Sequence, residues 1–89
     1  MITLTTDFGL KDPYVAEIKG AIYQINPKAT IVDVSNLVDK YSVRMGAFIL
    51  ASAAPFFPKG TVHVAVVDPG VGTERRAILI QTKQNFLVN

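Results

Sequence analysis

The sequence predicts an α/β fold, in which a mainly parallel sheet carries helices on both faces in a three-layer α/β/α arrangement. Two observations support this class. Apolar, β-rich segments alternate with segments whose apolar residues recur at helical spacing, in the order β-α-β-α-β. One β-rich segment, residues 61–67, is apolar almost throughout, which is typical of a strand buried on both faces of a parallel sheet. Each crossover between parallel strands should be right-handed.

The first part of the chain supplies a strand, a helix and a second strand. Residues 2–6 are β-rich and form the first predicted strand. Asp12 and Pro13 indicate a helix start, because Asp caps free N–H groups and Pro suits the first helical position. Apolar residues continue at helical spacing to about residue 25, where an Asn-Pro pair stops the helix. The second strand is predicted at residues 29–34.

The second part of the chain repeats the alternation and adds two further strands. Ser42 can cap a second helix that runs to about Ala54, where a proline ends it. A turn with proline second and glycine fourth then leads into the strand at residues 61–67. Further strands are predicted at residues 76–82 and 85–88.

Length and composition indicate an incomplete domain. The 89 residues make at most one domain, and 49% of them are apolar. Mean hydropathy is +0.32, which is high for so short a chain. The sequence also stops within the last predicted strand. We therefore expect residues 1–89 to be the amino-terminal part of a longer α/β protein, with apolar surface that meets a partner or further sequence.

Charge and residue usage exclude several classes of function. The formal net charge is +2, and the basic residues are scattered, with only Arg75 and Arg76 adjacent, so nucleic-acid binding is not favoured. The absence of cysteine excludes disulfides and thiolate metal sites, and no other metal cluster is visible. There is no signal peptide, and the longest apolar run, residues 45–57, is too short to span a bilayer. We expect a cytoplasmic protein without a metal.

Polar residues gather where the first three predicted strands end. Their carboxyl ends carry Asp7, the pair Ser35-Asn36 and Asp68, and parallel strands bring these ends to one edge. Open α/β sheets bind ligands at that edge. Asp7 could hydrogen-bond a ribose diol or a loop amide. Tyr41 precedes the second helix and could cover a pocket or simply pack.

The segment after residue 67 is the strongest candidate for chemistry. Asp68 is followed by Pro69 and Gly70, which suit the second and third positions of a turn. Arg75 lies seven residues after Asp68, where a returning chain could bring its guanidinium back to the carboxylate. The pair could orient a small nucleophile or grip a substrate; it could also be a turn-forming acid and a surface arginine. By contrast, Asp33 and His63 lie within predicted strands, and we expect both to be structural.

Four motifs, in order, resemble one known family. They are TTDFG at 5–9, VDVS at 32–35, FPKGTV at 57–62 and VVDPGVGT at 66–73. Together they resemble the S-adenosyl-L-methionine (SAM) hydrolases, also called SAM hydroxide adenosyltransferases, whose relatives include the SAM-dependent fluorinase and chlorinase. The resemblance covers essentially all of this chain but only the first part of the family's chain.

The resemblance implies a reaction without metal or added cofactor. Hydroxide attacks the ribose C5′ of SAM, and the products are adenosine and L-methionine. Asp68 and Arg75 match the acid and arginine that position the water, and Asp7 matches the carboxylate that holds the ribose hydroxyls. The halogenases lack the acid and the arginine, so the resemblance favours hydroxide over halide. Further positions that match pocket-lining residues of the family are Phe8, Tyr41, Gly70 and Val71.

The resemblance also implies what this chain lacks. The family usually has His where Asn36 stands, and it has a further catalytic His downstream of residue 89. Its β-rich C-terminal domain, which grips adenine and methionine, is also absent. Family members are homotrimers with shared active sites, so residues 1–89 alone should be inactive. Two alternatives remain: a SAM-dependent halogenase, and a non-catalytic fragment that binds a nucleoside or a partner.

Overall fold

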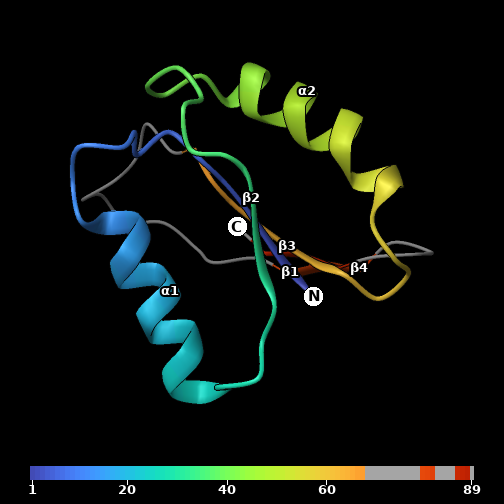
Figure 1. The fold of residues 1–89 in the computed structure, drawn as a ribbon. Coiled ribbons are helices and arrows are strands. Elements are labelled where there is room, and N and C mark those ends of the chain that lie inside the picture. Colours follow the sequence, from blue (N-terminus) through green and yellow to red (C-terminus); the bar gives the residue numbers. More distant parts are fainter. Residues whose placement is uncertain (68–78, 82–85, 89) are drawn as a thin grey trace.

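A computed structural model describes residues 1–67, 79–81 and 86–88. Its helices and strands alternate as the sequence predicts (Figure 1). In chain order they are β1 (Ile2–Thr6), α1 (Tyr14–Ile25), β2 (Ile31–Ser35), α2 (Val43–Ala53), the 3-10 helix η1 (Ala54–Phe56), β3 (Val62–Val66), β4 (Leu79–Gln81) and β5 (Phe86–Val88).

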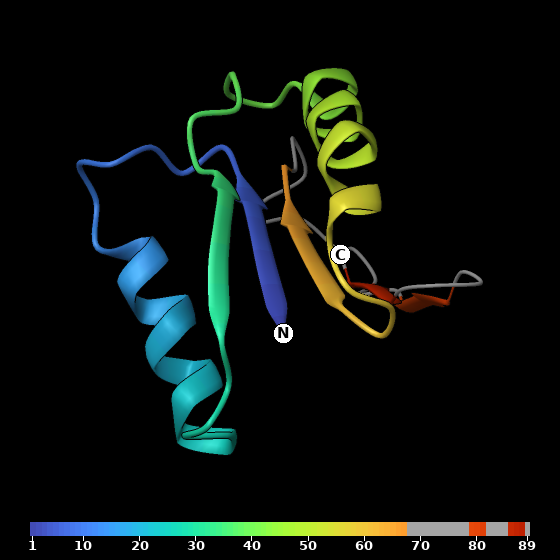
Figure 2. The same cartoon turned by 45° about the vertical axis from the view of Figure 1, so that its right-hand side comes forward.

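The described strands form one sheet in the order β2-β1-β3-β5-β4. β1 lies between β2 and β3 and pairs with both in parallel, and β5 runs parallel to β3. Only β4, within the described part of the chain, pairs antiparallel, with β5. The predicted α/β class with a mainly parallel sheet is therefore confirmed (Figure 2).

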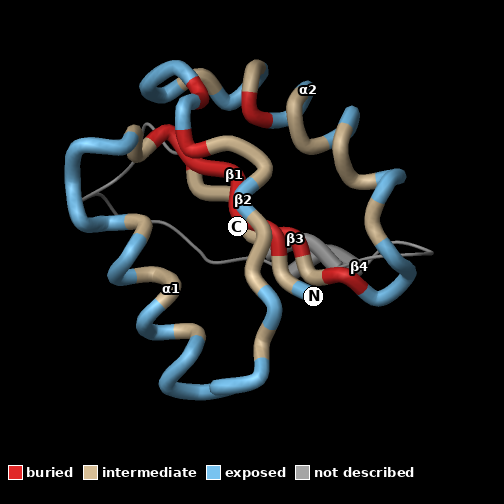
Figure 3. The backbone as a smooth tube through the Cα atoms, viewed as in Figure 1, coloured by how far each residue is buried: buried red, intermediate tan, exposed pale blue. Residues whose placement is uncertain are grey.

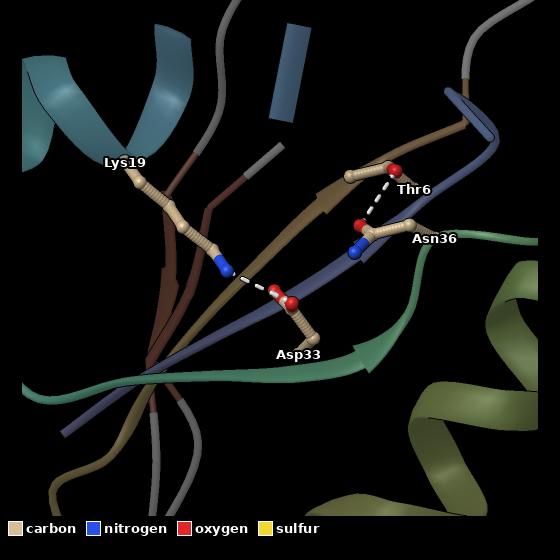
Figure 4. A network of polar contacts seen from close by, with 4 residues as sticks. All are labelled: Thr6, Lys19, Asp33 and Asn36. Atoms are coloured by element: carbon tan, nitrogen blue, oxygen red, sulfur yellow. Dashed lines mark hydrogen bonds and ion pairs between the residues drawn. The ribbon is translucent and has the colours of Figure 1, made fainter. Parts of the chain in front are cut away.

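The two helices lie on opposite faces of the sheet (Figures 1 and 2). Strands β2 and β3 flank β1 on opposite sides, so right-handed crossovers must place their connecting helices on opposite faces. On one face, Lys19 of α1 forms an ion pair of 2.9 Å with Asp33 of β2 (Figure 4). On the other face, Gly46 of α2 lies against Val67. Asp33 is thus a structural residue, as its place in a predicted strand indicates.

The buried residues gather along β1 and β3 and in the loop after β2 (Figure 3). Many of them are polar, because the central strand carries Thr3, Thr5 and Thr6, all fully buried beside Leu4. The hydroxyl of Thr3 is hydrogen-bonded to Nδ1 of His63 at 2.6 Å. The hydroxyl of Thr5, by contrast, is buried without a hydrogen-bond partner among the described residues.

His63 belongs to this core. Its ring meets the ring of Phe57 edge-on, with 5.8 Å between the centroids. Burial lowers the pKa of His63 below its ordinary value. At neutral pH the imidazole is therefore uncharged. It lies within the sheet, away from the carboxyl edge.

The helix boundaries test the sequence predictions in detail. Ser42 caps α2 as expected, since its Oγ accepts a hydrogen bond from the N–H of Met45 at 3.3 Å. The predicted Asp12 cap of α1 is wrong: Pro13 is the N-cap, and its carbonyl accepts from the N–H of Glu17 at 2.9 Å. Pro13 can take this place because a cap needs a free carbonyl and a proline has one.

β1 spans Ile2–Thr6 as predicted, whereas the boundaries of β2 and β3 differ from the predicted ones by one or two residues. β2 begins at Ile31 rather than at Ala29, and β3 is one residue shorter at each end. β4 and β5 lie within the ranges predicted for them. None of the described helices is long and apolar enough to cross a membrane.

Candidate functional site

The strand order places a topological switch point at the carboxyl ends of β1 and β3. The chain leaves β1 toward β2 on one side and then returns across β1 to β3 on the other. Such a reversal of direction is where open α/β sheets bind ligands. Asp7 directly follows β1, and its N–H donates to the carbonyl of Val66 at 3.3 Å, so Asp7 lies at this switch point.

Asp7 is a buried carboxylate with one oxygen held by the protein. Its residue is only 6% exposed, and Oδ2 accepts a hydrogen bond from the backbone N–H of Tyr41 at 2.9 Å. Of the two partners considered for Asp7, the loop amide is therefore present. Oδ1 has no protein partner among the residues that the structure describes. A hydroxyl donor on a ligand could bind there.

Tyr41 presents its N–H to Asp7 from a left-handed backbone conformation. Its φ is 63°, a value that costs a non-glycine residue about 1–2 kcal/mol. Neighbouring hydrogen bonds hold this turn, from Ser42 N–H to the Asp39 carbonyl and from Val43 N–H to the Tyr41 carbonyl. The tyrosine ring is 60% exposed, so it does not pack in the core. Backbone strain of this kind is common at ligand sites.

Phe8 connects the site to the start of α1. Its ring is tilted against that of Tyr14, with 5.8 Å between centroids. The N–H of Phe8 donates to the hydroxyl of Thr6 at 3.2 Å. Phe8 as a whole is half-buried.

The loops after β1 and β2 are joined by further hydrogen bonds. The hydroxyl of Thr6 donates to Oδ1 of Asn36 at 2.9 Å (Figure 4). The N–H of Gly9 donates to the Asn36 carbonyl at 2.7 Å, and that of Val38 to the Thr6 carbonyl at 3.2 Å. Sequence reasoning placed Asn36 at this edge but missed its contact with Thr6. The sequence offered one indication of this contact. Both residues are polar, Thr6 is the last residue of β1, and Asn36 directly follows β2.

Among the predicted site residues, the structure joins Asp7 and Tyr41 by a hydrogen bond. Phe8 follows Asp7 in the chain and contacts Tyr14, and the roles of all three stay predictions. Within the described ranges, no group of three His, Asp or Glu side chains could hold a metal ion. The predicted site residues that lie outside the described ones are Asp68, Gly70, Val71 and Arg75.

Residues 2–89 match the family described as SAM hydroxide adenosyltransferase N-terminal domain. The chain belongs to this family. The match runs over every described element of the sheet, including the edge that carries Asp7. The family resemblance of the four sequence motifs is therefore confirmed.

Named relatives include both hydrolases and halogenases. The (R)-S-adenosyl-L-methionine hydrolase of Methanocaldococcus jannaschii is 46% identical over 90 residues, which cover 97% of this chain and 34% of that protein. A fluorinase of an Actinoplanes species is 36% identical over 84 residues, which cover 94% of this chain and 28% of that protein. This member of the SAM hydroxide adenosyltransferase family thus spans about a third of the length of these curated relatives.

A solved structure has the same arrangement of elements. The crystal structure of an uncharacterized conserved protein from Thermotoga maritima superposes with a TM-score of 0.94 at 44% sequence identity. The superposition covers 99% of this chain and 34% of the Thermotoga protein. The fold of this SAM hydroxide adenosyltransferase domain therefore occurs as one part of a longer protein.

Proposed function

We propose that the full-length protein containing residues 1–89 hydrolyses SAM to adenosine and L-methionine. The single observation that carries this proposal is the buried Asp7 carboxylate at the carboxyl ends of β1 and β3. One of its oxygens is held by the Tyr41 N–H at 2.9 Å, and the other has no partner among the described residues. A fixed, buried carboxylate with an oxygen that no described residue binds suits the vicinal hydroxyls of a ribose. Membership of the family, and 46% identity to a named SAM hydrolase, support SAM as the ribose-bearing substrate.

The proposed reaction is a single displacement at carbon. Hydroxide derived from water forms the C5′–O bond while the C5′–S bond breaks, and the electron pair of that bond becomes a lone pair on the methionine sulfur. One proton of the water stays on the 5′-oxygen of adenosine, and the other is released to solvent. Because a sulfonium is already a good leaving group, the protein must mainly align the nucleophile and limit its solvation.

The proposed roles follow from position along the edge. Asp7 binds the ribose hydroxyls, while Asp68 and Arg75, which follow β3 in the sequence, position the attacking water. A carboxylate and a guanidinium can do so by accepting from and donating to the same water. The residues proposed to line the pocket around the nucleoside are Phe8, Tyr41, Gly70 and Val71.

We further propose that residues 1–89 form the amino-terminal part of a SAM-binding domain in a cytoplasmic homotrimer. The chain's span of about a third of its relatives supports a site completed by further sequence. Residues 1–89 alone would then leave the substrate loosely aligned and the water solvated. We expect them to be inactive.

A halogenase is the second candidate, because a fluorinase is among the relatives. The acid at position 68 and the arginine at 75 argue against it, since the resemblance assigns both to hydroxide rather than halide chemistry. A nucleoside-binding protein without turnover is the third. Product identity separates these candidates.

The test is to incubate the full-length protein with SAM and identify the nucleoside product by chromatography, with and without chloride and fluoride. Adenosine together with methionine, at a rate independent of halide, is the expected result. A 5′-halogenated adenosine would establish the second candidate, and binding without product the third. A second assay uses residues 1–89 at the same concentration, after circular dichroism has shown that they are folded. Their activity tests whether further sequence is needed.

A further inference from the structure

Asn36 is a buried polar residue in the first turn of chain after β2. It is 6% exposed, and two of its atoms accept hydrogen bonds from the loop that carries Asp7. Its side-chain Oδ1 accepts from the Thr6 hydroxyl at 2.9 Å (Figure 4), and its carbonyl accepts from the Gly9 N–H at 2.7 Å. The bonded residues lie on either side of Asp7 in the sequence. Asn36 is therefore hydrogen-bonded to residues on both sides of Asp7, the candidate ribose-binding carboxylate.

The contact with Thr6 determines which way the Thr6 hydroxyl points. That hydroxyl donates its proton to Asn36 Oδ1 and accepts from the Phe8 N–H at 3.2 Å. With its proton directed at Asn36, the hydroxyl presents a lone pair to the N–H of Phe8. A residue without an acceptor at position 36 would leave the hydroxyl free to rotate. The Phe8 N–H would then lose a fixed partner.

The same loop also reaches the Asp7 carboxylate itself. The Val38 N–H donates to the Thr6 carbonyl at 3.2 Å, and the chain then turns so that the Tyr41 N–H binds Asp7 Oδ2 at 2.9 Å. The backbone on both sides of Asp7 and one of its oxygens are thus tied to residues 36–41. Buried hydrogen-bond networks restrict the geometry of the groups that they join.

We infer that Asn36 is a positioning residue, which acts through Thr6 to hold Asp7 and Phe8 in the geometry that binds the nucleoside. This inference rests on the proposed function for the identity of the ligand. It also predicts that a histidine can replace Asn36 at this position. Nδ1 of a histidine lies the same number of bonds from the backbone as Oδ1 of Asn36, so a neutral imidazole can accept from the same Thr6 hydroxyl.

The binding test uses the full-length protein and adenosine, with affinity measured by titration calorimetry. Thr6→Val and Asn36→Leu remove the donor and the acceptor in turn, and each should raise the Kd for adenosine about tenfold. The double variant should be little worse than either single one, because both break the same interaction. Thr6→Ser and Asn36→His, which keep a donor and an acceptor, should stay within about twofold of wild type.

The matched control is Thr3→Val. It makes the same substitution in the same strand, removes a buried hydroxyl whose hydrogen bond to His63 is 2.6 Å, and lies outside the site. Its thermal stability should fall about as much as that of Thr6→Val, while its Kd for adenosine stays at the wild-type value. If Thr3→Val weakened binding as much as Thr6→Val, or if Thr6→Val bound adenosine like wild type, the positioning role would be overturned.

A ligand-free readout separates this inference from the proposed function. Amide hydrogen exchange over residues 7–12, followed by mass spectrometry, should be faster in Asn36→Leu than in wild type and restored in Asn36→His. Unchanged exchange in Asn36→Leu would overturn the positioning role even if SAM were hydrolysed. Faster exchange in a protein that neither binds adenosine nor hydrolyses SAM would instead support the positioning of the turn and refute the proposed function.

Discussion

Gly46 of α2 lies directly against Val67, at the end of β3. A Cβ built on Gly46 would stand 3.0 Å from Cγ2 of Val67, closer than ordinary van der Waals contact, and 3.8 Å from Val38. Val67 is buried, so its side chain has little room to move. Val67 directly precedes Asp68, the acid proposed to position water. The close approach of α2 is therefore to the residue that precedes the proposed water-positioning acid in the sequence.

We expect Gly46→Ala to destabilise the protein even though alanine favours helices. The gain in helix propensity of about 1 kcal/mol should be outweighed by overpacking, which costs about 1–3 kcal/mol. Gly20→Ala is the matched control, because Gly20 lies in α1 with nothing within 4 Å of a built Cβ. That variant should gain up to about 1 kcal/mol in the free energy of unfolding measured with urea. An equal gain in the free energy of unfolding from both substitutions would contradict this prediction, because Val67 would then have moved away from the added methyl group without cost.

The strained turn at Tyr41 can be tested by comparing two truncations. Tyr41→Ala and Tyr41→Gly both remove a ring that is 60% exposed, but only glycine adopts a φ of 63° without a steric penalty. In thermal unfolding, the glycine variant should be the more stable of the two, by about 1 kcal/mol. An alanine variant at least as stable as the glycine variant would mean that the conformation carries no strain.

Asp7 should matter for nucleoside binding, whereas Asp33 should not. Asp7→Ala removes a buried acceptor at the carboxyl edge of the sheet and should weaken adenosine binding by about 1.5–3 kcal/mol in titration calorimetry. Asp33→Ala removes a carboxylate whose partner among the described residues is Lys19, near the surface, so the variant should bind adenosine like wild type. Wild-type affinity in Asp7→Ala would remove the basis of the ribose assignment.

His63 should make stability depend on pH. Burial lowers its pKa in the folded protein below the ordinary value of 6.5, so in acid the unfolded chain binds the proton first. Its contribution to the free energy of unfolding is complete above about pH 6.5 and is lost as pH falls through the lowered pKa. His63→Gln should flatten this part of the curve of urea midpoint against pH. A wild-type curve that rises toward acid over the same range, relative to that of the variant, would contradict the assignment.

The sequence predicted the parts of the fold that depend on local pattern. Apolar periodicity located both helices and the strands of the parallel sheet, and the Ser42 cap was readable because a cap acts over only three residues. The Asp12 cap failed because Asp12 and Pro13 both suit a helix start, and local pattern does not decide which of them supplies the capping carbonyl. The central position of β1 could not be read, since it depends on pairing between distant segments.

The places of two proposed site residues in the fold could be predicted from strand position, and their roles stay predictions. Asp7 and Phe8 follow a predicted strand, and the structure places them at its carboxyl edge. The hydrogen bond from the Tyr41 N–H to Asp7 could not be predicted from the sequence, because it depends on a backbone conformation that tyrosine rarely adopts. The bond between Thr6 and Asn36 joins residues 30 positions apart, and no local pattern encodes it.

The central claim is that hydroxide attacks the ribose carbon, and isotope labelling tests it most directly. The full-length protein is incubated with SAM in water enriched in oxygen-18, and the products are analysed by mass spectrometry. Attack at C5′ places one heavy oxygen in the 5′-hydroxyl of adenosine and none in methionine. Adenosine without the label, or cleavage products other than adenosine and methionine, would contradict the account.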